Sequence, residues 1–286
     1  MIESTIDTRQ PRFWGTSSEQ APYRLRTPRL EDRFPSLEEI LASQDELPAL
    51  SLILGLGEDG VPLVVDLEDP EGSAFLIASD DGFDNTALLH NLITAALKGN
   101  HPEELFVHLI SPHADDLTYF HHQPHFRLSY QPFHPGTPIV IEEMVKLVIS
   151  RQQTPVPGTG HILAIDGLDL LWQALDPQAK LNLDWLIRNG PAVGLWVIAT
   201  VESTYLPQNL TGTIDMFPSR ILGPIQQANL ARFLSGFILN QVSDLTPGEE
   251  FLLITGGHPI HLQTLFSEEL ADQQTMNEII FSGGRK

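Results

Sequence analysis

Residues 76–86 read Leu-Ile-Ala-Ser-Asp-Asp-Gly-Phe-Asp-Asn-Thr, between a short apolar run and an amphipathic helical pattern. Strand, loop and helix in this order form the setting of a phosphate-binding loop, whose pattern is G-x-x-x-x-G-K-[ST]. Aligned on that pattern, the chain has Ser79 and Asp84 for the two glycines, Asn85 for the lysine and Thr86 for the Ser/Thr. Gly82 supplies a glycine inside the loop. The stretch predicts the scaffold of a phosphate loop without its chemistry.

The charges of this loop also oppose phosphate. In an active loop, backbone N–H groups and the helix N-terminus bind phosphate while the lysine reaches the β and γ oxygens. Here Asp80, Asp81 and Asp84 place three carboxylates where a triphosphate would lie. Two interpretations remain open from the loop alone. Either the carboxylates occupy the anion site themselves, or the segment is an ordinary strand–turn–helix with an aspartate cap.

A second motif lies in His161-Ile-Leu-Ala-Ile-Asp-Gly-Leu-Asp169, an apolar strand that ends in Asp166. This is the Walker B form, in which the aspartate holds the Mg²⁺ shell and a following glutamate polarises water. Gly167 occupies the position of that glutamate. We therefore expect no catalytic residue and only a vestigial nucleotide site, made of Ser79, Asp80, Asp81, Gly82, Asp84, Asn85, Thr86 and Asp166.

Composition limits the classes of function. The chain has 286 residues, 42% of them apolar, no cysteine and a formal net charge of −21. Disulfides and cysteine-ligated zinc are excluded, and no apolar run approaches the roughly 18 residues of a membrane span. Between residues 34 and 126 the only Lys or Arg is Lys98, so we do not expect DNA binding. The N-terminus shows no signal pattern, which makes the cytoplasm the expected location.

The chain divides into an arm, residues 1–34, and one domain, residues 35–286. The first 33 residues hold six Arg and five acidic residues and show no apolar periodicity. Two interpretations of the arm are open: an extended segment that docks through Phe13-Trp14 and Tyr23, or a disordered tail.

In the domain, strand patterns alternate with helical ones. Strands are predicted at Ser51–Leu56, Pro62–Asp66, Ala74–Ala78, Leu105–Ile110, His161–Ile165, Leu195–Thr200, Ser219–Leu222, Glu250–Thr255 and His261–Phe266. Helices are predicted at Asn85–Lys98, Ile141–Gln152, Ala179–Arg188 and Gln226–Leu234. Continuous apolar strands are typical of a parallel sheet that is buried on both faces. We expect an α/β fold, a mostly parallel P-loop NTPase-like sheet sandwiched by helices, which ends in an antiparallel hairpin at Gly256-Gly257.

From Ser51 to Glu269 the motifs resemble, in order, those of the motor domain of the FtsK/SpoIIIE family of DNA translocases, relatives of HerA and of type VII secretion ATPases. The matching segments are LGLGEDGVPLVVDL (54–67), FVHLISPH (106–113), QPHFRL (123–128), GLWVIATVES (194–203), FPSRI (217–221), LTPGEEFLL (245–253) and PIHLQTLF (259–266). The resemblance implies a RecA/FtsK-like ATPase domain in residues 35–286.

Most departures from the family pattern remove a polar or catalytic group. The polar or catalytic group of the family is absent at Asp84, Asn85, Ser111, His113, Gly167, Val201 and Glu202, and Ser79 replaces the first glycine of the loop. Gly82, Thr86, Asp166, Thr200 and Arg220 are retained. In the family the matching arginine lies near the subunit interface, so Arg220 has either an interface role or that of a salt-bridged strand residue.

The resemblance therefore predicts a catalytically inactive ATPase-fold protein that acts as a structural or regulatory interaction subunit. Its partner would be an active FtsK-like ATPase or another copy of the chain, and no cofactor is expected. Two alternatives remain. In one, Thr86, Asp166 and backbone N–H groups still bind ATP and Mg²⁺ in a translocase or secretion ATPase. In the other, the fold is reused for a small ligand or a metal.

Five histidines could serve such a metal, because they fall within 22 residues beside Asp115 and Asp116. They are His113, His121, His122, His125 and His134. Their H-H-x-x-H spacing is not a helical pair of ligands, and Pro124 interrupts a helix there. We therefore predict no metal site.

Overall fold

The computed structural model describes residues 13–14, 35–43, 47–48, 50–69, 74–114, 118–154, 158–236, 240–256 and 258–265. Within these residues the strands are β1 (Phe13–Trp14), β2 (Ser51–Leu56), β3 (Pro62–Asp66), β4 (Phe75–Ser79), β5 (Leu105–Ile110), β6 (Phe126–Tyr130), β7 (Gly160–Ile165), β8 (Leu195–Glu202), β9 (Ser219–Leu222), β10 (Glu250–Thr255) and β11 (His258–Gln263). The α-helices are α1 (Leu37–Ser43), α2 (Gly82–Gly99), α3 (Thr118–His121), α4 (Gly136–Gln153), α5 (Leu168–Ala174), α6 (Pro177–Asn189), α7 (Thr211–Ile214) and α8 (Ala228–Ser235).

The described strands form one sheet in the order β1-β3-β2-β11-β10-β9-β4-β8-β7-β5-β6. From β9 to β6 every neighbouring pair is parallel. From β1 to β9 every neighbouring pair is antiparallel. The carboxyl ends of the parallel strands therefore lie in a row along one end of the sheet. Ligands bind at this end in open α/β sheets.

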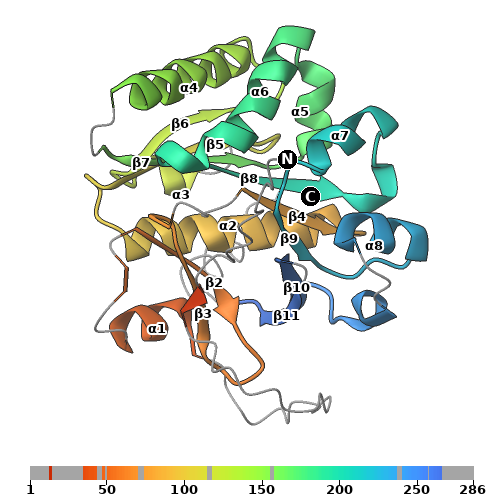
Figure 1. Cartoon of the computed structure of the whole chain (residues 1–286). Helices are drawn as coiled ribbons and strands as arrows, with labels where there is room; N and C mark the ends of the chain where they lie inside the picture. The colour runs from red at the N-terminus through yellow and green to blue at the C-terminus, as the bar shows by residue number, and fades with distance from the viewer. Residues whose placement is uncertain are drawn as a thin grey trace, which may run out of the picture.

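Helices cover both faces of the parallel strands (Figure 1). Alternate side chains of β4 show the division, because Leu76 packs in the core shared with α4, α5 and α6, whereas Phe75 and Ile77 pack in the core shared with α2. The antiparallel part curls below α2, where the β2–β3 hairpin and α1 lie in Figure 1. Lys98 near the end of α2 pairs with Glu38 of α1, with 2.7 Å between Nζ and Oε1.

The α/β sheet, with its parallel strands sandwiched by helices, confirms the predicted fold class. The nine predicted strands are all present, and β10 and β11 form the predicted antiparallel hairpin. The prediction of the last strand was wrong in its limits, because β11 begins at His258 and ends at Gln263; Phe266 and Gly257 lie outside the described residues. Edge strand β6 was missed because its side chains are half-buried or exposed and show no continuous apolar run.

Helices α2, α4 and α6 extend beyond their predicted limits at both ends, whereas α8 begins at Ala228 and not at the predicted Gln226. α4 begins at Gly136 rather than Ile141, with Pro138 in its first turn, where proline lacks only an N–H that has no helical partner. The short helices α1 and α5 were not predicted. In the arm, Phe13 and Trp14 pair with β3, opposite Val65 and Val64. Tyr23 and the rest of the arm lie outside the described residues. In the part of the chain that the structure covers, no helix combines the length and apolar character needed to cross a bilayer.

Candidate functional site

The connection from β4 to α2 is the first feature of the candidate site. The sequence predicted a loop over residues 79–86 and a helix from Asn85, but the helix begins at Gly82. Only Asp80 and Asp81 separate the last residue of the strand from the first residue of the helix. The backbone N–H of Asn85 already points to the carbonyl of Asp81, at 3.4 Å, as in a helix. The predicted start of the helix at Asn85 was therefore wrong, and little backbone remains between strand and helix to cradle phosphate.

Asn85, at the position of the phosphate-loop lysine, is turned into the protein. Its side chain is 1% exposed, and Nδ2 donates to the carbonyl of Val201 near the end of β8, at 3.0 Å. Its Oδ1 is buried and has no hydrogen-bond donor among the described residues. The residue thus carries no charge and reaches no ligand position.

Asp80 joins the ends of three strands. One carboxylate oxygen accepts a hydrogen bond from Ser203 Oγ, just after β8, and the other accepts one from the backbone N–H of Gln226, at 2.6 Å. Its own N–H donates to the carbonyl of Pro224, at 2.9 Å. Asp80 is therefore engaged within the chain, and its N–H is not free for an anion.

Glu202 covers the start of α2. A Cβ added at Gly82, the first helical residue, would lie 3.2 Å from Glu202 Oε2. The other oxygen, Oε1, accepts a hydrogen bond from Thr204 Oγ1, at 2.6 Å. Negative charge at a helix N-terminus is favourable, because the first N–H groups of the helix lack partners. A carboxylate of the protein thus lies at the end of the helix where a phosphate would bind.

Asp84 adds a second carboxylate at this helix end. It accepts a hydrogen bond from the backbone N–H of Gly248, while burial, and then the negative charge of Asp81, raise the pKa of its carboxyl above the ordinary value of 3.8. Its Oδ2 is buried without a donor among the described residues. A Cβ on Gly248 would lie 3.2 Å from Asp84 Oδ1, so the chain approaches closely there.

Asp166, the Walker B aspartate, is 3% exposed and surrounded by hydroxyl donors. Oδ1 accepts from Thr86 Oγ1 at 2.7 Å and from Thr200 Oγ1 at 3.3 Å. Oδ2 accepts from Ser111 Oγ at 2.9 Å. The structure thus brings Thr86 and Asp166 together, as the motifs predicted, but three hydroxyls occupy the coordination sphere of the carboxylate.

His90 belongs to this polar interior, although the sequence analysis did not identify it. Burial lowers the pKa of its imidazole, with a further lowering from His113, while the nearby carboxylate of Asp166 acts in the opposite direction. Nε2 is buried without a hydrogen-bond partner among the described residues. The available signal was its position four residues after Thr86, which places both side chains on one face of α2. Neutral His90 adds no positive charge for a phosphate.

The guanidinium of Arg220 makes its contacts within its own chain. Nη1 donates to the carbonyl of Leu234 at the end of α8, at 2.7 Å, and to that of Phe233, at 3.2 Å. Nη2 lies 3.4 Å from Asp215 Oδ1. The side chain is 14% exposed, and burial lowers the pKa of its guanidinium, against the opposing effect of Asp215. These contacts hold α8 on β9, and an interface role for Arg220 stays a prediction.

The histidines of residues 113–134 make other contacts where the structure describes them. Within the described ranges, no group of three or more His, Cys, Asp or Glu side chains could hold a metal ion. His125 bonds through Nε2 to the carbonyl of Asn100, at 2.9 Å, and His134 stacks on Tyr130. Asp115 and Asp116 lie outside the described residues.

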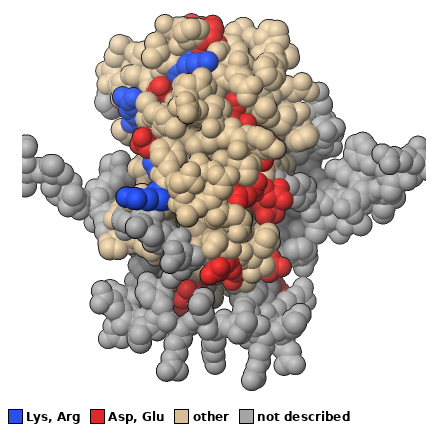
Figure 2. Space-filling view, turned by 90° about the vertical axis from the view of Figure 1, so that its right-hand side faces the viewer, with Lys and Arg blue, Asp and Glu red and all other residues tan. Residues whose placement is uncertain are grey.

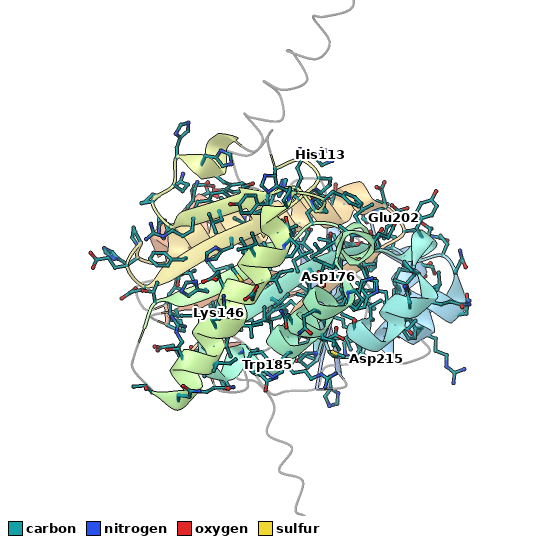
Figure 3. The ribbon with its side chains drawn as sticks, turned by 90° about the horizontal axis from the view of Figure 1, so that it is seen from above. His113, Lys146, Asp176, Trp185, Glu202 and Asp215 are labelled. Atoms are coloured by element: carbon teal, nitrogen blue, oxygen red, sulfur yellow. The ribbon has the colours of Figure 1, made fainter. Side chains whose placement is uncertain are left out.

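The described residues do not fit a nucleotide with Mg²⁺. Asn85 binds β8 instead of reaching a phosphate, Asp166 is surrounded by hydroxyls, and Glu202 lies over the start of α2. Glu202 and His113, both labelled in Figure 3, lie on the same side of the molecule, beyond the ends of β8 and β5. At the start of α2, the structure places the carboxylates of Glu202 and Asp84.

No protein-family model and no curated protein sequence matches the chain. Solved structures do resemble it. EssC (ATPases 2 and 3) from Geobacillus thermodenitrificans aligns with a TM-score of 0.64 and 13% identity, over 91% of this chain and 54% of that one. The cytoplasmic domain of the Thermomonospora curvata type VII secretion ATPase EccC gives 0.58 and 18%, over 79% and 30%. The pCW3 conjugation coupling protein TcpA with ATPγS gives 0.62 and 12%, over 81% and 72%.

These likenesses concern the fold. The fold is that of a P-loop NTPase-type α/β domain. More particularly, the fold is that of the FtsK/SpoIIIE-type ATPase domains, to which EssC, EccC and TcpA belong. The chain spans about a third of the length of the EccC structure and about half of that of EssC. The activities of those larger proteins are therefore not properties of this chain.

Proposed function

We propose that this chain is a catalytically inactive ATPase-fold subunit that acts through protein interaction, with an active FtsK-type ATPase as its partner. The observation that carries the proposal is the two-residue connection between β4 and α2. A phosphate loop needs a run of free backbone N–H groups between strand and helix, and a lysine at its end. This chain has neither, because positions 82–85 are helical and residue 85 is a buried asparagine.

The expected loss of catalysis is large. One positioned electrostatic donor is typically worth about 3–4 kcal/mol of transition-state stabilisation, and here both the lysine and the Walker B glutamate are absent. The Walker B aspartate is engaged within the protein, because the hydroxyls of Thr86, Ser111 and Thr200 donate to the carboxylate of Asp166. A fold that keeps its core but not its phosphate site retains a shape that a homologous subunit can recognise, and this supports a role in assembly.

Titration with a fluorescent ATP analogue and Mg²⁺ tests the first half of the proposal. We expect no saturable binding up to millimolar nucleotide. The double variant Asp84→Gly/Asn85→Lys restores two residues of the motif, and we expect it to stay inactive because the turn remains short. Tight binding by the wild-type chain would refute the proposal and favour a nucleotide-binding ATPase.

Analytical ultracentrifugation tests the second half, with a purified FtsK-type ATPase from the same source that has intact Walker motifs. A mixed species, with a change in the ATPase rate of the partner, is the expected result. A homo-oligomer that ignores the active ATPase would instead support self-assembly. A fluorescent DNA duplex at low salt is the control, and we expect no binding because the net charge is −21.

A further inference from the structure

Strands β5, β6 and β7 carry a group of contacting side chains rich in nitrogen, away from the candidate nucleotide site. His108 of β5 and His161 of β7 have stacked rings, with 5.3 Å between the centroids. Phe106 of β5 meets the His161 ring edge to face, at 5.5 Å. The guanidinium carbon of Arg127, on edge strand β6, lies 3.7 Å from the centre of the Phe106 ring. We call these four residues the amino-end cluster, because they lie towards the amino ends of their strands.

The amino-end cluster is on the face of the sheet that α4 covers. Val107 packs in the core shared with α2, so its neighbours Phe106 and His108 lie on the opposite face of β5. Arg151, in the last turn of α4, lies over the same region. It donates to backbone carbonyls shortly before β7 and β8, at 2.6 and 2.9 Å. A second guanidinium is therefore fixed beside the histidine pair.

The charges at the cluster are positive and lack carboxylate partners within the described residues. Arg127 is exposed, and neither it nor Arg151 forms an ion pair in that part of the chain. Glu103 and Glu104, which precede β5, pair with neither arginine in the described ranges. By contrast, Asp and Glu gather in the right-hand and lower parts of the face in Figure 2, on the side of α7 and α8. In a chain of net charge −21, the cluster is thus a local site of positive charge.

The histidine pair supplies a further hydrogen-bond donor. Nδ1 of His161 lies 3.1 Å from Nε2 of His108, whereas Nε2 of His161 makes no hydrogen bond with the described residues. Burial, then Arg127, lower the pKa of His108, and burial, then His108 and both arginines, lower that of His161, so both rings are neutral at pH 7. A neutral imidazole has one N–H. When His108 donates to His161, the N–H of His161 is therefore on its unpaired Nε2.

A small oxyanion complements these groups. Arg127 presents a planar set of N–H donors, His161 adds a donor from another strand, and Arg151 adds charge. A carboxylate offers two oxygens and one charge, whereas a phosphate offers at least three acceptor oxygens and nearly two charges at pH 7. A phosphate group can therefore accept from both side chains at once. DNA would bring its further phosphates against an acidic surface, which disfavours a polyanion.

We propose that the amino-end cluster binds a phosphate-type oxyanion, either the free ion or the phosphate of a monoester. Arg127 binds two of its oxygens, Nε2 of His161 donates to a third, and Arg151 holds the charge in place. The bound anion favours the tautomer in which His108 donates to His161. The cluster is at the opposite end of the parallel strands from Thr86, so this inference goes beyond the proposed function and does not depend on it.

The test is a titration with inorganic phosphate at constant ionic strength, followed through the imidazole signals of protein with isotope-labelled histidine in NMR. We expect a saturable shift of the His161 signal at millimolar phosphate, and a higher pKa for His161, because the anion offsets the positive charges. Arg127→Gln should weaken binding at least about tenfold, since a charge-assisted pair of hydrogen bonds is lost. Arg232→Gln removes an exposed arginine from α8 and is the matched control, with less than about a twofold effect. Equal weakening by both variants would mean attraction by bulk charge and would overturn the proposal.

Two further titrations identify the ligand. Acetate at the same ionic strength should leave the His161 signal in place, and a saturable shift equal to that with phosphate would overturn the assignment to phosphate. Phenyl phosphate that binds as tightly as inorganic phosphate supports a monoester, whereas binding of the inorganic ion alone supports the free anion. If neither saturates, there is no site. Because no nucleotide is used, failure here leaves the ATP titration to judge the inactive subunit independently.

Discussion

Thr86 Oγ1 donates a hydrogen bond to Asp166 Oδ1 at 2.7 Å, which joins the first turn of α2 to the end of β7. In an active phosphate loop the corresponding hydroxyl and aspartate meet through Mg²⁺ and its shell. Here they bond directly, and Thr200 and Ser111 complete the set of donors around the same carboxylate. Groups that would serve a metal in a working site instead fasten α2 to the sheet, so they have become part of the stability of the fold.

Asp166→Ala should therefore destabilise the protein by about 3 kcal/mol, because it leaves the buried hydroxyls of Ser111 and Thr200 and the half-buried hydroxyl of Thr86 without their acceptor. Thr86→Val removes one donor and should cost about 1 kcal/mol. Thr86→Ser keeps the hydroxyl and is the matched control. Urea unfolding followed by circular dichroism measures the differences. An Asp166→Ala protein as stable as the wild type would show that the hydroxyls find other partners.

Gly248→Ala should destabilise the protein through Asp84. Gly248 has φ +72°, which costs an alanine about 1–2 kcal/mol, and its new Cβ would lie 3.2 Å from Asp84 Oδ1. Gly60 has φ +77° but no atom within 4 Å of its Cβ position. Gly60→Ala therefore reports the backbone cost alone. We expect a lower thermal midpoint for Gly248→Ala than for Gly60→Ala, and equal midpoints would mean that the contact with Asp84 is soft.

Local sequence patterns predicted much of the fold. They did not predict that side chains from distant parts of the chain occupy the candidate site. The apolar run 161–165 predicted β7 and its terminal Asp166, because a strand buried on both faces needs such a run. Edge strand β6 has no comparable signal. Glu202, which lies over the start of α2, is 120 residues after Gly82 in the chain and reaches the helix start only in the folded protein. No local pattern in residues 76–86 contains that partner.

The pH dependence of Asp84 gives a third prediction. Its pKa is raised above 3.8 in the folded chain, chiefly by burial, so the unfolded chain loses this proton at lower pH than the folded one. Stability from this group is therefore greatest below pH 3.8 and falls as pH rises through the folded pKa. Asp84→Asn removes that penalty, and we expect it to stabilise the protein at pH 7 but not at pH 3.5. Denaturant midpoints of both proteins at the two pH values measure this, and a gain of the same size at both would contradict it.

The last prediction concerns a pair of histidines, His108 and His161, on the face of the sheet that α4 covers. His108 Nε2 and His161 Nδ1 lie 3.1 Å apart on neighbouring strands β5 and β7. Burial, with Arg127, lowers the pKa of His108 to about 4, and burial, with His108 and nearby arginines, lowers that of His161 to about 3. Both imidazoles are therefore neutral at pH 7 in the folded chain. One proton lies between the two ring nitrogens, and a further proton would put a positive charge on the pair, close to Arg127 and Arg151.

Because both pKa values are below the ordinary 6.5, the unfolded chain binds more protons as the solution is acidified. The stability contributed by the pair is complete above pH 6.5 and is lost as pH falls towards 4 and then 3. His161→Gln should flatten this part of the stability curve, since one titrating group and its repulsion are gone. Denaturant midpoints between pH 7 and pH 4 measure the slope, with exposed His122→Gln as the control. If His122→Gln flattens the curve as much as His161→Gln does, the buried pair is not the cause of the acid sensitivity.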